Sequence, residues 1–85
     1  MPYRIEWRPA ARREIHKLPK GIAKRVFAVV DLLAANPRPD GCRKLAGYEA
    51  RYRVRAGDYR AVYEVRDAVL VVFVVTVGHR REVYR

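Results

Sequence analysis

The stretch YRVRAGDYR, residues 52–60, alternates arginines with aromatic and aliphatic residues up to an Ala-Gly-Asp turn. Alternate side chains of a β-strand lie on the same face of the sheet. Arg51, Arg53 and Arg55 should therefore point one way, and the tyrosine and valine between them the other way. The alternation predicts a strand over about residues 48–55, with one basic face and one apolar face.

The residues that follow predict two more strands of a meander. Gly57 can adopt the positive φ of a compact turn at residues 56–58, so a second strand is expected over about residues 59–65. Another tight turn is expected at residues 66–67, and a third strand over about residues 69–77. This third strand is apolar at nearly every position, which is typical of a central strand covered on much of both faces.

Before the meander, the sequence predicts one strand and two helices. Residues 3–7 alternate in polarity as a strand with one buried face does. Pro9 suits the first turn of a helix, and Pro19 and Gly21 break that helix and open the next one. The loop at residues 36–41 contains two prolines and a glycine and ends the second helix. The second helix has an amphipathic stripe made of Ile22, Val26, Phe27, Val29, Val30 and Leu33.

The order of these elements predicts an α+β fold: an N-terminal strand, a helical hairpin and a three-stranded antiparallel meander. We expect one twisted, mainly antiparallel sheet with the helices packed on one face. The length of 85 residues indicates a single domain over residues 1–85. The other face of the sheet is then left to the arginines.

The net charge of the chain indicates which classes of molecule it binds. The sequence has 19 Lys and Arg against 9 Asp and Glu, a formal net charge of +10. Such a surface attracts nucleic acid, anionic lipid or an acidic protein. Nucleic acid is the favoured partner, and a solvated basic face without a ligand is the alternative. A row of guanidinium groups beside tyrosines suits RNA, whose bases can stack, better than a metabolite.

The cysteine content and the hydropathy pattern favour the cytoplasm and exclude a membrane span. Cys42 is the only cysteine, so no internal disulfide can form, as is usual in a reducing compartment. Residues 1–13 are charged and have no apolar run, so we expect no secretory signal. The longest apolar run, residues 69–75, is shorter than the ~20 residues that a spanning helix needs.

The residue types point to metal-independent phosphate chemistry. His16 and His79 are the only histidines, and neither has a cluster of carboxylates near it in the sequence, so a two-metal nuclease is not expected. Arginine presents forked donors that match phosphate oxygens, and it keeps its proton. It therefore stabilises developing negative charge and is a poor general base. His79 and Tyr84 are the candidates for proton transfer.

Structural interpretations of the same residues stay open. Arg51, Arg53 and Arg55 can form a solvated face with no ligand, and Arg60 can pair with Glu64 on its own strand. Tyr59, Tyr63 and Tyr84 can cover the core instead of stacking on bases, and His79 can be structural. We assign no function to His16, which lies away from the apolar stripe of the first helix.

Several short motifs in this order resemble those of the RelE/ParE superfamily of toxins from toxin–antitoxin pairs, over nearly the whole chain. They are KLAG at residues 44–47, YRVR at 52–55, GDYRAVY at 57–63, and VGHR with EVY at 77–84. The resemblance implies a RelE-like fold and, for RelE-like members, a metal-independent endoribonuclease without a cofactor. Such members cut messenger RNA in the ribosomal A site by attack of the 2′-hydroxyl, which leaves a cyclic phosphate.

The resemblance also implies roles for individual residues. Arg53 and Arg55 occupy positions where RelE itself has lysines, and Arg60 binds the scissile phosphate. Arg80 stabilises the transition state, and Tyr84 orients the nucleotide or assists proton transfer. The remaining RNA-binding candidates are Lys44, Arg51, His79 and Arg81.

Two other functions remain open from the sequence. A ParE-like toxin shares this fold but poisons DNA gyrase and cuts no RNA. A non-catalytic basic module only binds RNA or ribosomes. For a toxin, the implied partners are messenger RNA, the ribosome and a cognate antitoxin, whose acidic or amphipathic segment opposes the arginines.

Overall fold

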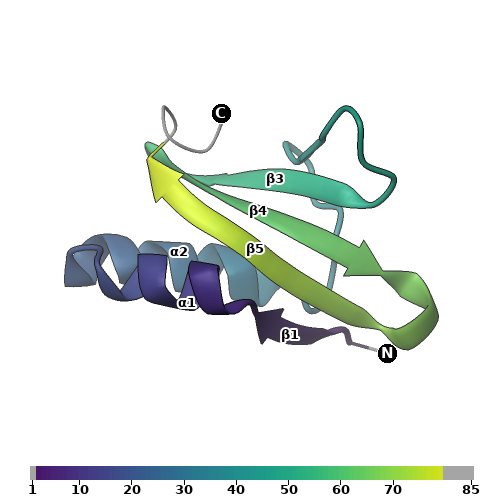
Figure 1. Ribbon diagram of the computed structural model, residues 1–85, viewed down its shortest axis with the longest axis horizontal. Coiled ribbons are helices and arrows are strands. Elements are labelled where there is room, and N and C mark those ends of the chain that lie inside the picture. Colours follow the sequence, from purple (N-terminus) through teal and green to yellow (C-terminus); the bar gives the residue numbers. More distant parts are fainter. Residues whose placement is uncertain (1, 80–85) are drawn as a thin grey trace.

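Strand β5 (Val71–His79) is an inner strand of a five-stranded sheet in the computed structural model, which describes residues 2–79. The order of strands is β1-β5-β4-β3-β2. β1 (Arg4–Trp7) runs parallel to β5, and every other pair is antiparallel. The meander consists of β3 (Arg51–Ala56), β4 (Tyr59–Arg66) and β5 (Figure 1). The predicted α+β fold is confirmed.

Three details of the sheet differ from the prediction. A short strand β2 (Arg43–Lys44) pairs with β3 at the sheet edge, where no strand was predicted. β3 begins at Arg51 instead of residue 48, because the residues before it form turns. β4 leads into a 3₁₀ helix, η1 (Asp67–Val69), and Leu70 then adopts a φ of 55°, so β5 begins only at residue 71.

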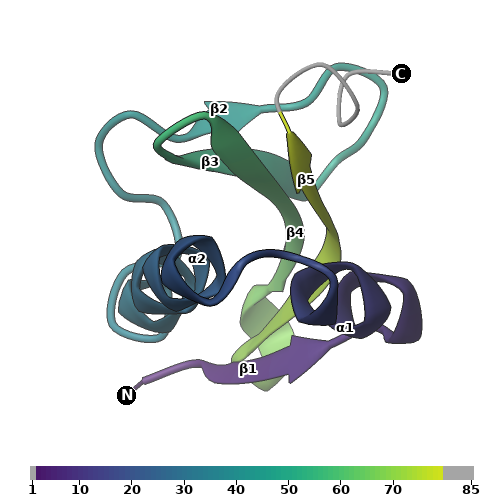
Figure 2. The same cartoon turned by 90° about the vertical axis from the view of Figure 1, so that its left-hand side faces the viewer.

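Two helices follow β1 and pack on the sheet. α1 (Pro9–His16) begins with proline at its first position, where a backbone N–H would have no partner within the helix. Its last turn contains Arg13 and His16, and cationic side chains interact favourably with a helix C-terminus. α2 (Lys20–Leu32) follows after Pro19. α1 packs against β5 and α2 against β3 and β4, so the curved sheet partly surrounds the helices (Figure 2).

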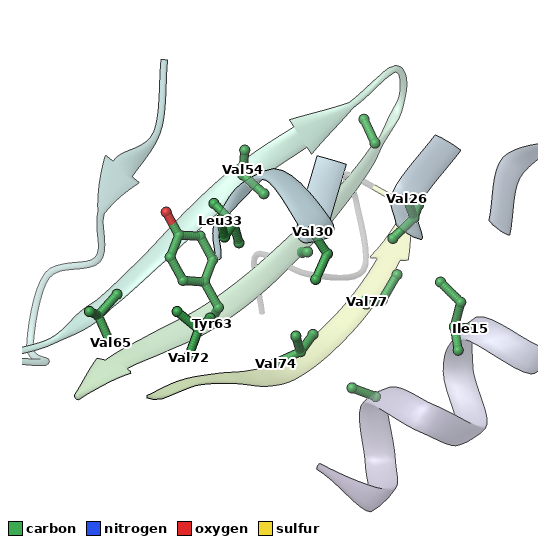
Figure 3. Close-up of a cluster of buried hydrophobic side chains, with 13 residues drawn as sticks. Ile15, Val26, Val30, Leu33, Val54, Tyr63, Val65, Val72, Val74 and Val77 are labelled. Atoms are coloured by element: carbon green, nitrogen blue, oxygen red, sulfur yellow. The ribbon is translucent and has the colours of Figure 1, made fainter. Parts of the chain in front are cut away.

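The core lies between the helices and one face of the sheet. Its fully buried side chains include Val26 and Val30 of α2, Val72 and Val74 of β5, and Tyr63 of β4 (Figure 3). The amphipathic stripe of α2 is therefore confirmed at its centre. Phe27, expected to widen the stripe, is 40% exposed and instead packs its ring 5.1 Å from that of Trp7.

The loop after α2 is fastened to the sheet by polar contacts. The hydroxyl of buried Tyr63 donates to the carbonyl of Pro37 at 2.7 Å, and burial raises the pKa of Tyr63. The guanidinium of Arg38 donates to both carboxylate oxygens of Asp67, at 3.2 and 2.8 Å. The hydrogen bond from Arg38 lowers the pKa of Asp67, and the hydroxyl of Tyr3 also donates to that carboxylate. These contacts hold the loop, η1 and the N-terminal segment together.

A side chain of α1 bonds to the part of β5 that β1 does not cover. β1 covers only the first part of β5, up to Val74. Beyond it, the carboxylate of Glu14 accepts a hydrogen bond from the backbone N–H of Val77 at 2.9 Å and from the hydroxyl of Thr76 at 2.8 Å. A side chain of α1 thus satisfies a donor that a neighbouring strand would otherwise bind.

Within residues 2–79, neither helix has the length and apolar character needed to cross a bilayer.

Replacement of Tyr63 by phenylalanine tests the anchoring of the loop. The substitution keeps the buried ring but leaves the Pro37 carbonyl without its donor, so we expect a loss of about 1 kcal/mol in the free energy of unfolding. Urea denaturation followed by circular dichroism measures the change. The matched control is Tyr48→Phe, because Tyr48 is 51% exposed and should be neutral. Equal stability of Tyr63→Phe and the wild type would show that this bond does not hold the loop.

Candidate functional site

Arg55 and Arg60 lie directly opposite one another on β3 and β4, near the turn that joins these strands. Directly opposed side chains share a face of the sheet and lie close together. Arg53, two residues back along β3, faces the same way. Val54 and Ala56 point to the other side and are buried in the core. The predicted division of this hairpin into a basic and an apolar face is confirmed.

A β-bulge determines which residue of β5 lies beside Arg60. The register between β4 and β5 shifts by one residue between Val62 and Tyr63, and beyond the shift Arg60 pairs with Gly78. Because glycine has no side chain, β5 adds no bulk over the guanidinium of Arg60. Arg60 is only 9% exposed. Its charge therefore lies in a partly desolvated setting, where electrostatic interactions are stronger than in water.

Arg43 joins this group although the sequence did not single it out. It pairs with Arg53 across β2 and β3 and is exposed. Burial, Arg43 and Arg55 together lower the pKa of Arg53, as expected where cations are crowded. We call the sheet side that presents Arg43, Arg51, Arg53, Arg55 and Arg60 the arginine face.

Arg51 lies at the other end of the arginine face and is held by Glu64. Its Nε is 3.4 Å from one carboxylate oxygen of Glu64, and the Nε of Arg66 is 2.5 Å from the other. Arg8 approaches the same carboxylate at 3.9 Å. Burial acts to raise the pKa of Glu64, but the hydrogen bonds from Arg66 and Arg51 outweigh it, so the pKa lies below its ordinary value.

Two of the expected RNA-binding residues do not reach the arginine face. His79 pairs with Tyr59 and packs against its ring at 5.5 Å, on the side that faces the helices. Strict alternation from the start of β5 would have placed His79 beside the arginines, but the bulge reverses the faces beyond it. Lys44 pairs with Tyr52 and therefore also lies on the helix side. The remaining candidates, Arg80, Arg81 and Tyr84, lie outside the described residues.

The chemistry available on the described part of the site is that of arginine. Arg53, Arg55 and Arg60 place fixed positive charge on one side of the sheet, and the more exposed Arg53 and Arg55 present N–H donors there, which suits phosphate oxygens. Within residues 2–79 there is no group of three or more His, Cys, Asp and Glu side chains that could hold a metal ion. The arrangement can bind and polarise a phosphodiester, and proton transfer needs other groups.

Comparisons with known proteins agree with this geometry. Residues 5–84 match the family model described as ParE toxin of type II toxin–antitoxin system, parDE. The chain is 38% identical to Toxin RelG of Mycobacterium tuberculosis, with 100% of this chain and 99% of that protein covered. It is 33% identical to mRNA interferase toxin RelE of Escherichia coli, with 99% and 92% covered.

Solved structures of similar proteins have the same fold. The toxin–antitoxin complex RelBE2 of Mycobacterium tuberculosis contains a chain that superimposes with a TM-score of 0.82 at 30% identity, covering 94% of this chain and 100% of that one. The intact Escherichia coli RelBE toxin–antitoxin complex gives a TM-score of 0.80 at 30% identity, with 91% and 95% covered.

Replacement of Glu64 by glutamine tests the buried carboxylate. The three arginines lose their counter-charge, so we expect the free energy of unfolding to fall by about 1–2 kcal/mol near neutral pH, reduced by solvent screening of the partly exposed partners. Because folding lowers the pKa of Glu64, its contribution is present above the unfolded pKa and is lost as the pH falls through the folded value. Urea midpoints measured from about pH 7 down to about pH 3 should therefore converge for the two proteins.

The matched control is Glu49→Gln. Glu49 is exposed and makes no ion pair with any residue in the described range 2–79. A difference between wild type and Glu64→Gln that stays constant across the pH range would contradict the assigned electrostatic role.

Proposed function

The chain belongs to the ParE toxin family of type II toxin–antitoxin systems, and we propose that it is a toxin that inhibits translation by cutting messenger RNA on the ribosome. The observation that supports this proposal best is the cross-strand pair of Arg55 and Arg60, with Arg53 on the same face and glycine opposite Arg60. The name of the Escherichia coli relative, mRNA interferase toxin, supports the same activity.

In the proposed reaction, the 2′-hydroxyl of the nucleotide attacks the adjacent phosphorus. The bond from phosphorus to the 5′-oxygen breaks, so the products are a 2′,3′-cyclic phosphate and a 5′-hydroxyl. One proton leaves the 2′-oxygen and one is delivered to the 5′-oxygen, and no metal ion takes part. The step therefore needs a positive environment around the phosphate and a route for the two protons.

We assign phosphate binding to the arginines and proton transfer to other groups. Arg60 binds the scissile phosphate, because it is the least exposed of these arginines and its charge acts in a partly desolvated setting. Arg53 and Arg55 flank it and stabilise the charge that develops on the phosphate oxygens. Arg80 adds to this stabilisation, and Tyr84 orients the nucleotide or assists proton transfer. The RNA strand on either side is bound by Arg51 and Arg81, whereas Lys44 and His79 lie on the helix side and take no part.

The proposed partner in the cell is a cognate antitoxin, as in the RelBE complexes that this chain resembles. Its acidic side chains oppose the arginine face, because complementary charge both attracts and orients a partner. Messenger RNA and the ribosome are the other proposed partners, and they place the protein in the cytoplasm.

Replacement of Arg60 or Arg55 by glutamine tests the phosphate-binding role. Loss of one preorganised cationic donor should lower the cleavage rate by about 10²–10³-fold. Primer extension on translated messages after induction measures cleavage in cells. Arg55 is exposed, so Arg55→Gln separates a catalytic effect from a folding defect at the buried Arg60. Arg12→Gln on the exposed side of α1 is the charge-matched control and should cleave as the wild type does.

The outcomes also separate the alternative functions. Unchanged cleavage by Arg55→Gln and Arg60→Gln would contradict the assigned roles. The alternative of a ParE-like gyrase poison would be supported by inhibition of supercoiling by a protein that cuts no message. Ribosome binding without any cleavage would support a non-catalytic module.

Binding of the antitoxin should block the arginine face. We expect the purified toxin–antitoxin complex to lose affinity for ribosomes, because the carboxylates of the antitoxin occupy the arginines that meet RNA. Co-sedimentation of free toxin and of complex with ribosomes measures this loss. Sedimentation of the intact complex with ribosomes to the same extent as the free toxin would contradict the blocking.

A further inference from the structure

A hollow lies at the end of the sheet away from Arg55 and Arg60. It is formed between residues 47–51, where the chain enters β3, and residues 64–69, where β4 passes into η1. Both segments lie at the right-hand end of the sheet in Figure 1. Its volume is about 550 Å³, within the range of small-molecule sites. We call it the Tyr48 hollow.

The floor of the hollow contains two arginines that are held in place by one buried carboxylate. Arg51 and Arg66 each use Nε to donate to a different oxygen of Glu64, which is 9% exposed. Both bonds therefore leave the terminal Nη groups of the two guanidinium groups available for another acceptor. Because the side chains are already ordered, binding through these groups loses little conformational freedom.

The walls of the hollow are apolar and partly aromatic. Tyr48 is 51% exposed, and the guanidinium of Arg51 lies over its ring at 4.5 Å from the ring centre. Val69 and Ala68 contribute exposed aliphatic surface from η1. An exposed tyrosine stacked with an arginine is a surface on which a planar ring can continue the stack.

The polar groups favour a nucleotide over a simple anion. Besides the two arginines, the carboxylates of Glu49, Glu64 and Asp67 line the hollow, and Asp67 is already paired with Arg38. A bare phosphate is an anion and is repelled by the carboxylates. A nucleobase has flat apolar faces and an edge with both donors and acceptors, and its phosphate adds the anion that the arginines bind.

We propose that the Tyr48 hollow binds one unstacked nucleotide of a single-stranded RNA, with the base on Tyr48 and Arg51 and the phosphate on the Nη groups of Arg51 and Arg66. The ligand class rests on the proposed function, since the RNA that meets Arg55 and Arg60 continues along the arginine face. The site itself is separate, because Arg51 and Arg55 lie four residues apart, or about 13 Å along β3.

The test measures binding of a labelled single-stranded RNA of about 12 nucleotides by fluorescence anisotropy, without ribosomes. Tyr48→Leu removes the stacking ring, and we expect affinity to fall by about 5–20-fold. Tyr48→Phe keeps the ring and should bind within about twofold of the wild type. Both substitutions are at an exposed position, and circular dichroism confirms that the variants are folded.

A charge substitution and an abasic RNA give two further readouts. Arg66→Gln should weaken binding and lower the slope of log K against log salt by about 0.7, the value for one phosphate contact on a single strand. Arg12→Gln, on α1, should leave the loss caused by Tyr48→Leu unchanged. An RNA with an abasic nucleotide at the position that occupies the hollow should bind the wild type more weakly. The same abasic change should not weaken RNA binding by Tyr48→Leu any further.

Three results would overturn the proposal. The first is that Tyr48→Leu binds RNA as tightly as the wild type. The second is that the abasic nucleotide weakens binding equally in the wild type and in Tyr48→Leu. The third is that a glutamate-rich peptide binds in an Arg66-dependent way while RNA binding does not depend on Tyr48. Failure of the proposed function looks different, because wild-type protein would then cut no message on ribosomes while its RNA binding still depended on Tyr48. If the wild type cuts messages but its RNA binding does not depend on Tyr48, only the proposed nucleotide site in the Tyr48 hollow is contradicted.

Discussion

The alternation of side chains in the β3–β4 hairpin is the constraint on which both the core and the arginine face depend. Val54 and Tyr63 can be buried against the helices only if Arg53 and Arg60 point the other way. A slip of one residue would exchange the two faces and place guanidinium groups in the core. Because an uncompensated buried charge costs several kcal/mol, the register of this hairpin is strongly specified. The same packing that stabilises the domain therefore fixes the positions of the arginines.

The β-bulge between β4 and β5 adds a second constraint, which decides what borders Arg60. Beyond the bulge, Val77 returns to the core and Gly78 lies opposite Arg60, while His79 packs on Tyr59. Without the shift, Val77 and not Gly78 would lie opposite Arg60. The bulge thus places a residue without a side chain opposite Arg60, and Glu14 of α1 binds the part of β5 beyond the bulge.

The local features of the fold could be predicted from the sequence, and the long-range ones could not. The hairpin faces follow from alternation within β3, and the helices follow from Pro9, Pro19 and the apolar stripe of α2. The strand β2 has two residues and no periodicity, so Arg43 could be placed beside Arg53 only after the pairing was known. The position of His79 on the helix side could not be predicted for a similar reason, because an apolar strand such as β5 shows no break in pattern where a bulge is inserted.

The arginines at the two ends of the sheet have different surroundings. At the far end, Glu64 pairs with Arg51 and Arg66, and its hydrogen bonds order them. Near the hairpin turn, burial lowers the pKa of Arg53, and the nearby positive charges of Arg43 and Arg55 lower it further. A chain of 85 residues has limited stability to offset such repulsion. An anionic ligand or partner that neutralises this end stabilises the folded chain by the free energy of its own binding. The crowding weakens the folded state when that face is empty, and the proposed binding of RNA or an acidic antitoxin there would offset this cost.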